Sequence, residues 1–357
     1  MKRFFSLLVI TLFLVVILSG VSFGGKLKIG FIYVGPVGDA GWTYAHDLGR
    51  KYLEKSVKGV ETVYLESVPE GSESITAMEN FIATGCKVIF ATSYGYMDPV
   101  QELAKRYPNV IFEHCSGYKR AKNVGTYFGR MYEPRFLTGI VAGLMTKSNK
   151  IGYVAAHPIP EVIRGINAFA LGVRKVNPEA IVTVVWTNTW YDPATEKEAA
   201  LSLLEAGCDV IAQHQDSPAP QQAAEEKGVY SIGYNSDMSK FAKKAHLTAP
   251  IWNWGVIYEY IVKEVLNKTW KSEDIWWGMD KEAVDIAPFG PMVPDEVKAK
   301  VSEYKEKIEN GSFFVFSGPI KDQKGNLIVK EGERLSDSDM LRMNFFVEGV
   351  KGTIQSK

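Results

Sequence analysis

The chain contains the segment Lys28-Ile-Gly-Phe-Ile-Tyr-Val-Gly-Pro-Val-Gly-Asp39-Ala-Gly-Trp42-Thr-Tyr44-Ala-His46. An apolar run typical of a buried strand leads into a Gly/Pro/Asp turn, and the turn leads into the start of a helix. In a parallel α/β sheet, ligands bind at that end of the strand. The glycines of the turn match neither phosphate-loop pattern, G-x-G-x-x-G or G-x-x-x-x-G-K-[ST]. The turn instead places the aromatic Trp42 beside the carboxylate of Asp39, which favours a flat, neutral, hydrogen-bonding ligand over a pyrophosphate.

A structural role is the alternative for the same two residues. Asp39 would cap the following helix, and Trp42 would be the first side chain of that helix to enter the core. Gly41 and Asp39 leave little side-chain bulk nearby to bury an indole, and this favours the binding role.

The first residues are typical of a secretory signal peptide. A basic head, Met1-Lys2-Arg3, precedes an apolar run from Phe4 to Leu18, and the small residues Ser22 and Gly24 follow. This pattern predicts a signal peptide over residues 1–24, cleaved within a residue or two of Gly24. An uncleaved anchor is the alternative, but the apolar run is short for a membrane span. No cysteine lies near the cleavage site, so we expect an unlipidated, soluble chain that is periplasmic or secreted.

The charge balance excludes some classes of partner. Lys2 and Arg3 account for two of the 41 basic side chains, so the mature chain would carry 39 against 41 acidic ones, a net charge of about −2. Such a chain has no basic excess for nucleic acid and no polybasic tract for a membrane surface. We expect no nucleic-acid partner and no direct membrane insertion of the mature chain.

The cysteines and histidines give no metal or cofactor site. Cys86, Cys115 and Cys208 each adjoin an apolar strand, which predicts small buried core residues, and the odd count leaves at least one free thiol. No Cys-x-x-Cys or His-x-x-x-His pair occurs, so neither a metal nor a cofactor is expected.

One structural unit recurs along the chain. The unit consists of an amphipathic helix, a Gly-Cys stop and a short apolar strand. It occurs around Gly85-Cys86 and again around Gly207-Cys208. Strands and helices alternate in this way through both halves, with helices predicted near 42–57, 72–84, 97–107, 132–147, 160–176, 194–206, 217–227 and 253–267. The fold class is therefore α/β, with two doubly wound α/β domains joined by a hinge.

The predicted domains follow from where the chain crosses between the two halves, near 128–133, 250–254 and 288–294. The N-terminal α/β lobe is predicted to contain residues 25–129 plus 254–294, and the C-terminal α/β lobe residues 130–253. Residues 295–357 form a predicted tail, with a helix and short strands, that returns to the first lobe.

Aromatic, amide and carboxylate side chains gather at the predicted strand ends, with few cations. This composition suits a sugar or an aromatic heterocycle, because rings stack on Trp and Tyr while polar groups read the edges. Asp237 has helix capping as its structural alternative. The candidate ligand-binding residues are Asp39, Trp42, Tyr94, Trp190, Asp216, Asn235, Asp237 and Asn253.

Catalysis has little support in the sequence. Neither Gly-x-Ser-x-Gly nor His-Glu-x-x-His occurs. Ser93, His114 and Asp216 could assemble in a cleft, but their spacing does not single them out. We expect a binding protein and not an enzyme, with no catalytic residues.

Four segments together resemble the basic membrane protein family of ABC-transporter substrate-binding proteins, which includes the purine nucleoside receptor type. They are Gly38-Asp39-Ala-Gly-Trp42-Thr43, Tyr132-Glu133-Pro-Arg135-Phe-Leu-Thr-Gly139, Trp190-Tyr-Asp192-Pro-Ala-Thr-Glu-Lys197-Glu-Ala-Ala200 and Ile232-Gly-Tyr-Asn235-Ser-Asp237. Asp39 matches the family's Asp, Trp42 stands where the family has Phe, and Thr43 replaces its Asn. The resemblance implies a periplasmic-binding-protein fold of type I, a small-molecule ligand in an interdomain cleft, and an ABC permease and ATPase as partners.

Two departures from the family bear on the ligand. Asn235 stands where nucleoside-binding members have an Asp that holds the ribose, and Trp252-Asn253-Trp254 stands where a lysine is common. We therefore expect a purine base such as adenine over a purine nucleoside. The resemblance implies that Trp42 and Trp190 stack on the two faces of the ring, one from each lobe. The remaining alternatives are a sugar or nucleoside hydrolase, and a ligand-sensing partner of a membrane receptor.

The signal-peptide pattern gives a first testable prediction. Protein recovered from the medium or periplasm should begin near Gly25 and carry no lipid, because the cleavage signal ends at Gly24. N-terminal sequencing and intact-mass measurement would check both points. Retention of Met1 on the exported protein would contradict the prediction.

Overall fold

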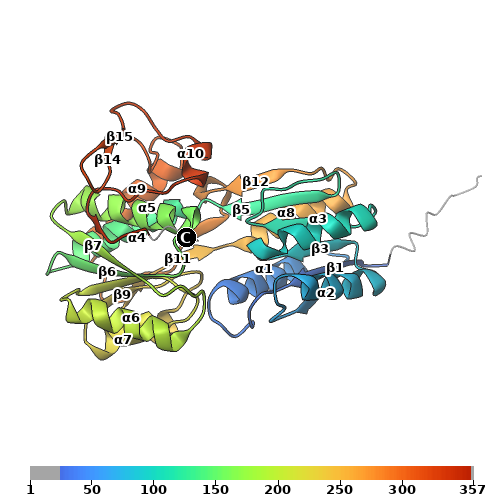
Figure 1. Ribbon diagram of the computed structural model, residues 1–357, viewed down its shortest axis with the longest axis horizontal. Coiled ribbons are helices and arrows are strands. Elements are labelled where there is room, and N and C mark those ends of the chain that lie inside the picture. The colour runs from blue at the N-terminus through green and yellow to red at the C-terminus, as the bar shows by residue number, and fades with distance from the viewer. Residues whose placement is uncertain (1–24, 355–357) are drawn as a thin grey trace, which may run out of the picture.

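The computed structural model describes residues 25–354 and contains two α/β lobes side by side (Figure 1). Residues 1–24, the predicted signal peptide, lie outside the described residues. Each lobe is built on a six-stranded sheet whose neighbouring strands run parallel. The predicted fold class, two doubly wound α/β domains, is confirmed.

The first lobe surrounds a sheet formed mostly by the first third of the chain. In spatial order its strands are β12 (Asp274–Trp277), β5 (Val124–Gly129), β4 (Ile111–Cys115), β3 (Val88–Ala91), β1 (Leu27–Ile32) and β2 (Val60–Leu65). Its helices are α1 (Trp42–Ser56), α2 (Ser72–Ala83), α3 (Met97–Arg106) and α8 (Trp254–Leu266). Helix α8 packs against α1, so a segment far along the chain completes this lobe.

The second lobe repeats this arrangement. Its sheet has the order β10 (His246–Thr248), β9 (Tyr230–Ile232), β8 (Val210–His214), β6 (Lys150–Ala155), β7 (Ile181–Trp186) and β16 (Val350–Lys351). Its helices are α4 (Tyr132–Met145), α5 (Pro160–Val176), α6 (Pro193–Glu205) and α7 (Ala219–Glu226). The strands read as continuous apolar runs because helices cover both faces of the sheet.

The repeated Gly-Cys stops end two helices in the same way. Gly85 and Gly207 have φ of 96° and 88°, a left-handed conformation that glycine adopts without a Cβ clash. The following cysteines, Cys86 and Cys208, are buried in the core, as predicted, and Cys115 is also a buried free thiol.

Three chain crossings and a small two-stranded sheet join the lobes. Strand β5 leads into α4, and β11 (Pro250–Trp252) leads into α8. Strand β11 pairs antiparallel with β13 (Val284–Ile286), and Figure 1 shows β11 between the two lobes. The third crossing runs from β12 to β13 through residues 278–283, and not near 288–294 as predicted. Residues that follow β13 lie along the second lobe, because the Gly290 N–H donates to the Leu247 carbonyl at 2.8 Å.

The prediction that the tail returns to the first lobe is wrong. Helix α9 (Asp295–Glu309) packs on α4, and β16 pairs with β7 at the edge of the second sheet. Between them lie β14 (Ile320–Lys321), β15 (Leu327–Val329) and α10 (Asp337–Leu341), drawn over the second lobe in Figure 1. The reason is an unpaired edge: β7 ends the second sheet on one side, and the tail strand satisfies its free backbone groups.

Neither a metal cluster nor a membrane-spanning helix occurs in the part of the chain that the structure describes. Over residues 25–354 no group of three or more His, Cys, Asp or Glu side chains could hold a metal ion. No helix within that range is long and apolar enough to cross a bilayer.

Candidate functional site

Asp39 organises the turn between β1 and α1. Its carboxylate accepts hydrogen bonds from the backbone N–H groups of Gly41 at 2.8 Å, Thr43 at 2.9 Å and Tyr44 at 2.9 Å. The side chain is buried, so these three donors replace its lost hydration. Asp39 thus has the capping role given above as its structural alternative, and it also fixes the start of α1.

The tip of this turn touches the second lobe directly. A Cβ added to Gly41 would lie 2.3 Å from the Asp216 carbonyl oxygen and 2.6 Å from the Asp216 Cα. Next to this contact, the Ser236 hydroxyl donates to the Ala40 carbonyl at 2.6 Å. The carboxyl ends of the two sheets therefore meet in a closed arrangement of the lobes.

Three polar side chains form a chain of hydrogen bonds beside this contact. Asn235 donates through Nδ2 to the Asp216 carboxylate at 2.8 Å, and Trp252 donates through Nε1 to the Asn235 amide oxygen at 2.8 Å. Asn235 has φ of 66°, a left-handed conformation that Asn tolerates better than most residues. The Asp216 N–H donates to the Trp190 carbonyl at 3.1 Å. Trp252 thus positions the side-chain amide of Asn235, and this amide in turn positions the carboxylate of Asp216.

The two carboxylates at the contact repel each other. Burial raises the pKa of Asp216 well above its usual range, and the negative charges of Asp39 and Glu196 add to the shift. Hydrogen bonds from the Asn235 side chain and the Trp42 backbone N–H act in the opposite direction. The pKa of Asp39 is also raised by burial, against the N–H groups that lower it. The pair therefore favours a proton or hydrogen-bond donors between the lobes.

Trp42 packs at the edge of an aromatic cluster. Its Nε1 donates to the Thr92 carbonyl at 2.8 Å, which fixes the indole. Its ring is perpendicular to Trp252 at 5.6 Å between centroids and lies edge-on to Trp254, also at 5.6 Å. Trp252 and Trp254 stack on each other at 4.5 Å with an interplanar angle of 13°. Trp42 thus has a structural role in this cluster while its side chain remains partly exposed.

Trp190 lies on the second-lobe side and is 42% exposed. Its ring contacts His157 at 4.9 Å and His214 at 6.2 Å. Trp42 and Trp190 thus come from different lobes, and each has its own set of ring partners.

Three of the predicted site residues have local roles elsewhere. Tyr94 is 56% exposed, and the pKa of its hydroxyl is raised by burial and by the neighbouring Tyr118. Asp237 accepts from the Ser239 N–H at 2.9 Å and so caps the short turn after it. Asn253 donates to the Glu282 carbonyl at 2.9 Å, which links α8 to the third crossing. The structure therefore brings together Asp39, Trp42, Asp216 and Asn235, with Trp190 attached through its backbone.

Sequence reasoning missed Arg135, a buried cation of this region. Its guanidinium is 0% exposed, donates through Nη1 to the Gln213 carbonyl at 2.7 Å, and lies 3.9 Å over the Tyr234 ring. The one available signal was a basic residue within the apolar helix 132–145. Helical periodicity alone would assign such a residue to a solvated face.

No catalytic set assembles from Ser93, His114 and Asp216 in the described part of the chain. His114 Nε2 bonds to the Ser93 backbone carbonyl at 2.8 Å, and burial lowers the pKa of His114 to about 4. Asp216 accepts from the Asn235 amide through Oδ1, and the Ser93 hydroxyl donates to Glu70 at 2.6 Å and not to His114. No nucleophile–base–carboxylate relay connects the three.

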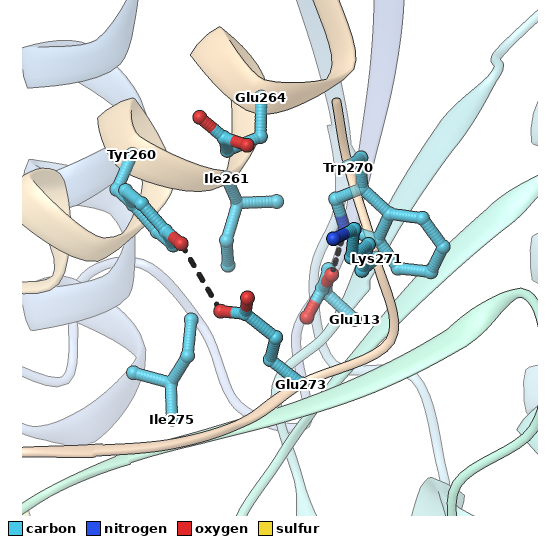
Figure 2. Close-up of a pocket in the computed structure, with 8 residues that line it drawn as sticks. All are labelled: Glu113, Tyr260, Ile261, Glu264, Trp270, Lys271, Glu273 and Ile275. Carbon is cyan, nitrogen blue, oxygen red and sulfur yellow. Dashed lines mark hydrogen bonds between the residues drawn. The ribbon is translucent and has the colours of Figure 1, made fainter. Parts of the chain in front are cut away.

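A separate pocket lies under α8 in the first lobe. Figure 2 shows Trp270 Nε1 donating to Glu113 at 2.8 Å and the Tyr260 hydroxyl donating to Glu273 at 3.1 Å. Burial raises the pKa of Glu113 to about 8. The cavity volume is about 10 Å³, which is room for one water molecule and too little for a ligand.

Comparison with known proteins connects this geometry to a family. The model of the family described as "ABC transporter substrate-binding protein PnrA-like" matches residues 26–314. Members of that family are extracytoplasmic solute-binding proteins of ABC transporters.

Two relatives are similar over nearly their whole length. A purine-binding protein of Brucella abortus is 47% identical over 326 residues, which cover 91% of this chain and 93% of the relative. A putative ABC transporter glucose-binding protein of Haloferax volcanii is 42% identical over 340 residues, covering 95% and 84%.

Solved structures agree on the fold. A solute-binding protein of an ABC transporter system from Conexibacter woesei has a TM-score of 0.70 at 20% identity, covering 81% of this chain and 98% of that one. A solute-binding protein from Aeropyrum pernix has a TM-score of 0.69 at 18% identity, covering 83% and 93%. The family and these relatives are binding proteins and not enzymes. The resemblance seen in the sequence is confirmed, and this chain belongs to the PnrA-like family of ABC-transporter substrate-binding proteins.

Proposed function

We propose that this protein captures a purine outside the cytoplasm and delivers it to an ABC permease and its ATPase. The free base, with adenine as the first candidate, is preferred over the nucleoside. The observation that carries the proposal is the buried pair of carboxylates, Asp39 and Asp216, beside Trp42 where the two lobes meet. Acceptors on two sides and an indole nearby suit a flat ring that carries several N–H donors.

The preference for the base has a chemical reason. A free purine base carries a ring N–H at the position where a nucleoside carries its sugar, so only the base offers that donor to a carboxylate. At the position where nucleoside-binding relatives have an Asp, Asn235 gives its amide N–H to Asp216 and its oxygen to Trp252. Those groups are already paired and are poorly placed to hold ribose hydroxyls.

Binding is proposed to work by hinge closure. In the open form the ligand ring would stack on one lobe, and rotation about the three crossings would bring the other lobe over it. The contact of Gly41 with Asp216 belongs to the closed form, so a ligand that offsets the repulsion of the two carboxylates shifts the equilibrium toward that form. The closed shape is the one proposed to dock on the permease, and the ligand is not altered chemically.

A sugar is the second candidate, because the Haloferax volcanii relative is named as a putative glucose-binding protein. Stacking on tryptophan also suits the apolar face of a sugar. The purine is favoured because the Brucella abortus relative, which has the higher identity of the two, is named as a purine-binding protein.

Calorimetry with a ligand panel separates these candidates. Adenine should bind, adenosine should bind more weakly because it lacks the free ring N–H, and glucose and ribose should not bind. Tighter binding of adenosine than of adenine would contradict the argument from Asn235. Binding of glucose with no binding of any purine would replace the proposal by the sugar.

Alanine at either tryptophan should weaken binding. Loss of one stacking surface costs about 1–3 kcal/mol, which is about tenfold to a hundredfold in affinity. Trp42→Ala and Trp190→Ala are to be compared by calorimetry, with circular dichroism to verify folding. Trp186→Ala is the control, because the Trp186 Nε1 donates to the Thr353 carbonyl in the tail and should affect folding alone. Normal binding by folded Trp42→Ala would show that Trp42 is not the stacking residue, and Trp252 or Trp254 would be the next candidate.

Gly41→Ala should block closure while both lobes stay folded. The added Cβ would overlap the Asp216 backbone of the other lobe in the closed form, and an open form relieves the overlap. Since binding requires the closed state, affinity should fall by about tenfold or more. Gly38→Ala is the matched control, because a Cβ there meets nothing within 4 Å. Small-angle scattering with and without ligand would detect the failure to close, and a Gly41→Ala variant that still contracts would refute this mechanism.

A further inference from the structure

Arg135 presents an unexplained pair of buried donors. Its guanidinium makes one hydrogen bond, to the Gln213 carbonyl, while Nε and Nη2 have no partner among the described residues. Contact with the Tyr234 ring at 3.9 Å offsets part of the cost of burying the charge. A buried cation with unused donors calls for an acceptor that the protein itself does not supply.

The missing side chain of Gly165 on α5 leaves a gap about the size of one methyl group beside two of the unpaired groups. A Cβ added to Gly165 on α5 would lie 3.6 Å from Arg135 Nε and 3.6 Å from His214 Nδ1, with nothing closer. His214 Nδ1 and the Tyr153 hydroxyl also have no partner within residues 25–354. Tyr153 lies next to this space, because its ring is 5.5 Å from the Arg135 Cζ. Buried polar groups from α4, β6 and β8 thus converge where Gly165 has no side chain.

Glu161 supplies an acceptor near the same space. It lies one helical turn before Gly165 on α5, so both face the same side of the helix. Its Oε1 is 3.5 Å from His214 Nε2, and its side chain is 25% exposed to solvent. Burial raises the pKa of Glu161, and the positive charges of Arg164 and Arg135 act in the opposite direction. The Arg135 guanidinium, a donor, and the Glu161 carboxylate, an acceptor, therefore lie near each other without a direct hydrogen bond.

We propose that Arg135 and Glu161 together hold the edge of a nucleobase on which a ring nitrogen adjoins an exocyclic N–H donor. Arg135 donates to the acceptor atom, and Glu161 accepts from the adjacent N–H. This inference rests on the proposed function and deepens it. Asp39 and Asp216 would bind one edge of the ring, and Arg135 and Glu161 would bind another. The two are adjacent, because His214, Gln215 and Asp216 are consecutive and the Trp190 ring lies 6.2 Å from His214.

Unsubstituted purine is the probe for this subsite, since it lacks the exocyclic amine of adenine. Calorimetry on the full mature chain should show adenine binding about tenfold or more tightly than purine. In Glu161→Ala that difference should shrink, because adenine loses its acceptor and purine loses nothing. Glu198→Ala, an exposed carboxylate on α6 of the same lobe, is the matched control and should leave both affinities unchanged.

Gly165→Ala tests the space itself without weakening the fold. Alanine is favoured over glycine inside a helix, and its Cβ would make ordinary contacts at 3.6 Å. The melting temperature should be unchanged or higher, while adenine affinity should fall about tenfold. Equal binding of purine and adenine by the wild type, or normal adenine binding by both variants, would overturn the subsite alone. Failure of every purine to bind the wild type would overturn the proposed function together with it.

Discussion

The contact between Gly41 and Asp216 is the constraint on which the rest of the site depends. It brings the carboxyl ends of two separate sheets together, and it leaves no room for a Cβ. Two acidic side chains, Asp39 and Asp216, are buried there, and burial raises the pKa of each. Bringing like charges into a low-dielectric interface is costly unless a proton or a donor intervenes. That cost makes the closed state sensitive to what lies between the lobes.

The hinge and the site share the same aromatic residues. Trp252 ends β11, stacks on Trp254 at the start of α8, and donates to Asn235, which in turn holds Asp216. A rotation about the crossing at 252–254 therefore moves the support of the carboxylate as well as the lobes. The Trp42 indole packs edge-on against the same pair, so the aromatic cluster links the first turn of α1 to the hinge. In the closure proposed above, these shared residues would connect ligand contact to the movement of the lobes.

Charge distribution separates this site from a phosphate site or a catalytic one. The strand-end region combines acceptors at Asp39, Asp216 and Glu161 with the buried cations Arg135 and Arg164. A heterocycle that carries both donors and acceptors on its rim complements that set, whereas a pyrophosphate would meet repulsion from the carboxylates. Burial lowers the pKa values of His114 and His214, which favours the neutral form of both rings.

The sequence by itself determined the elements, the fold class and the family, while the tertiary structure decided which side chains meet. Apolar periodicity and the Gly-Cys stops are local signals, because the backbone pairs and the helix faces they encode lie within a few residues. Helix α5 was predicted over 160–176 and occurs there. The turn that carries Asp39 and Trp42 was predicted between a strand and a helix for the same reason. The partnership of Asp216 with Asn235, the local roles of Asp237 and Asn253, and the buried Arg135 depend on segments that meet only after folding. The two-residue strand β16 carries no periodic pattern, so only the open edge of β7 could determine which lobe the tail joins.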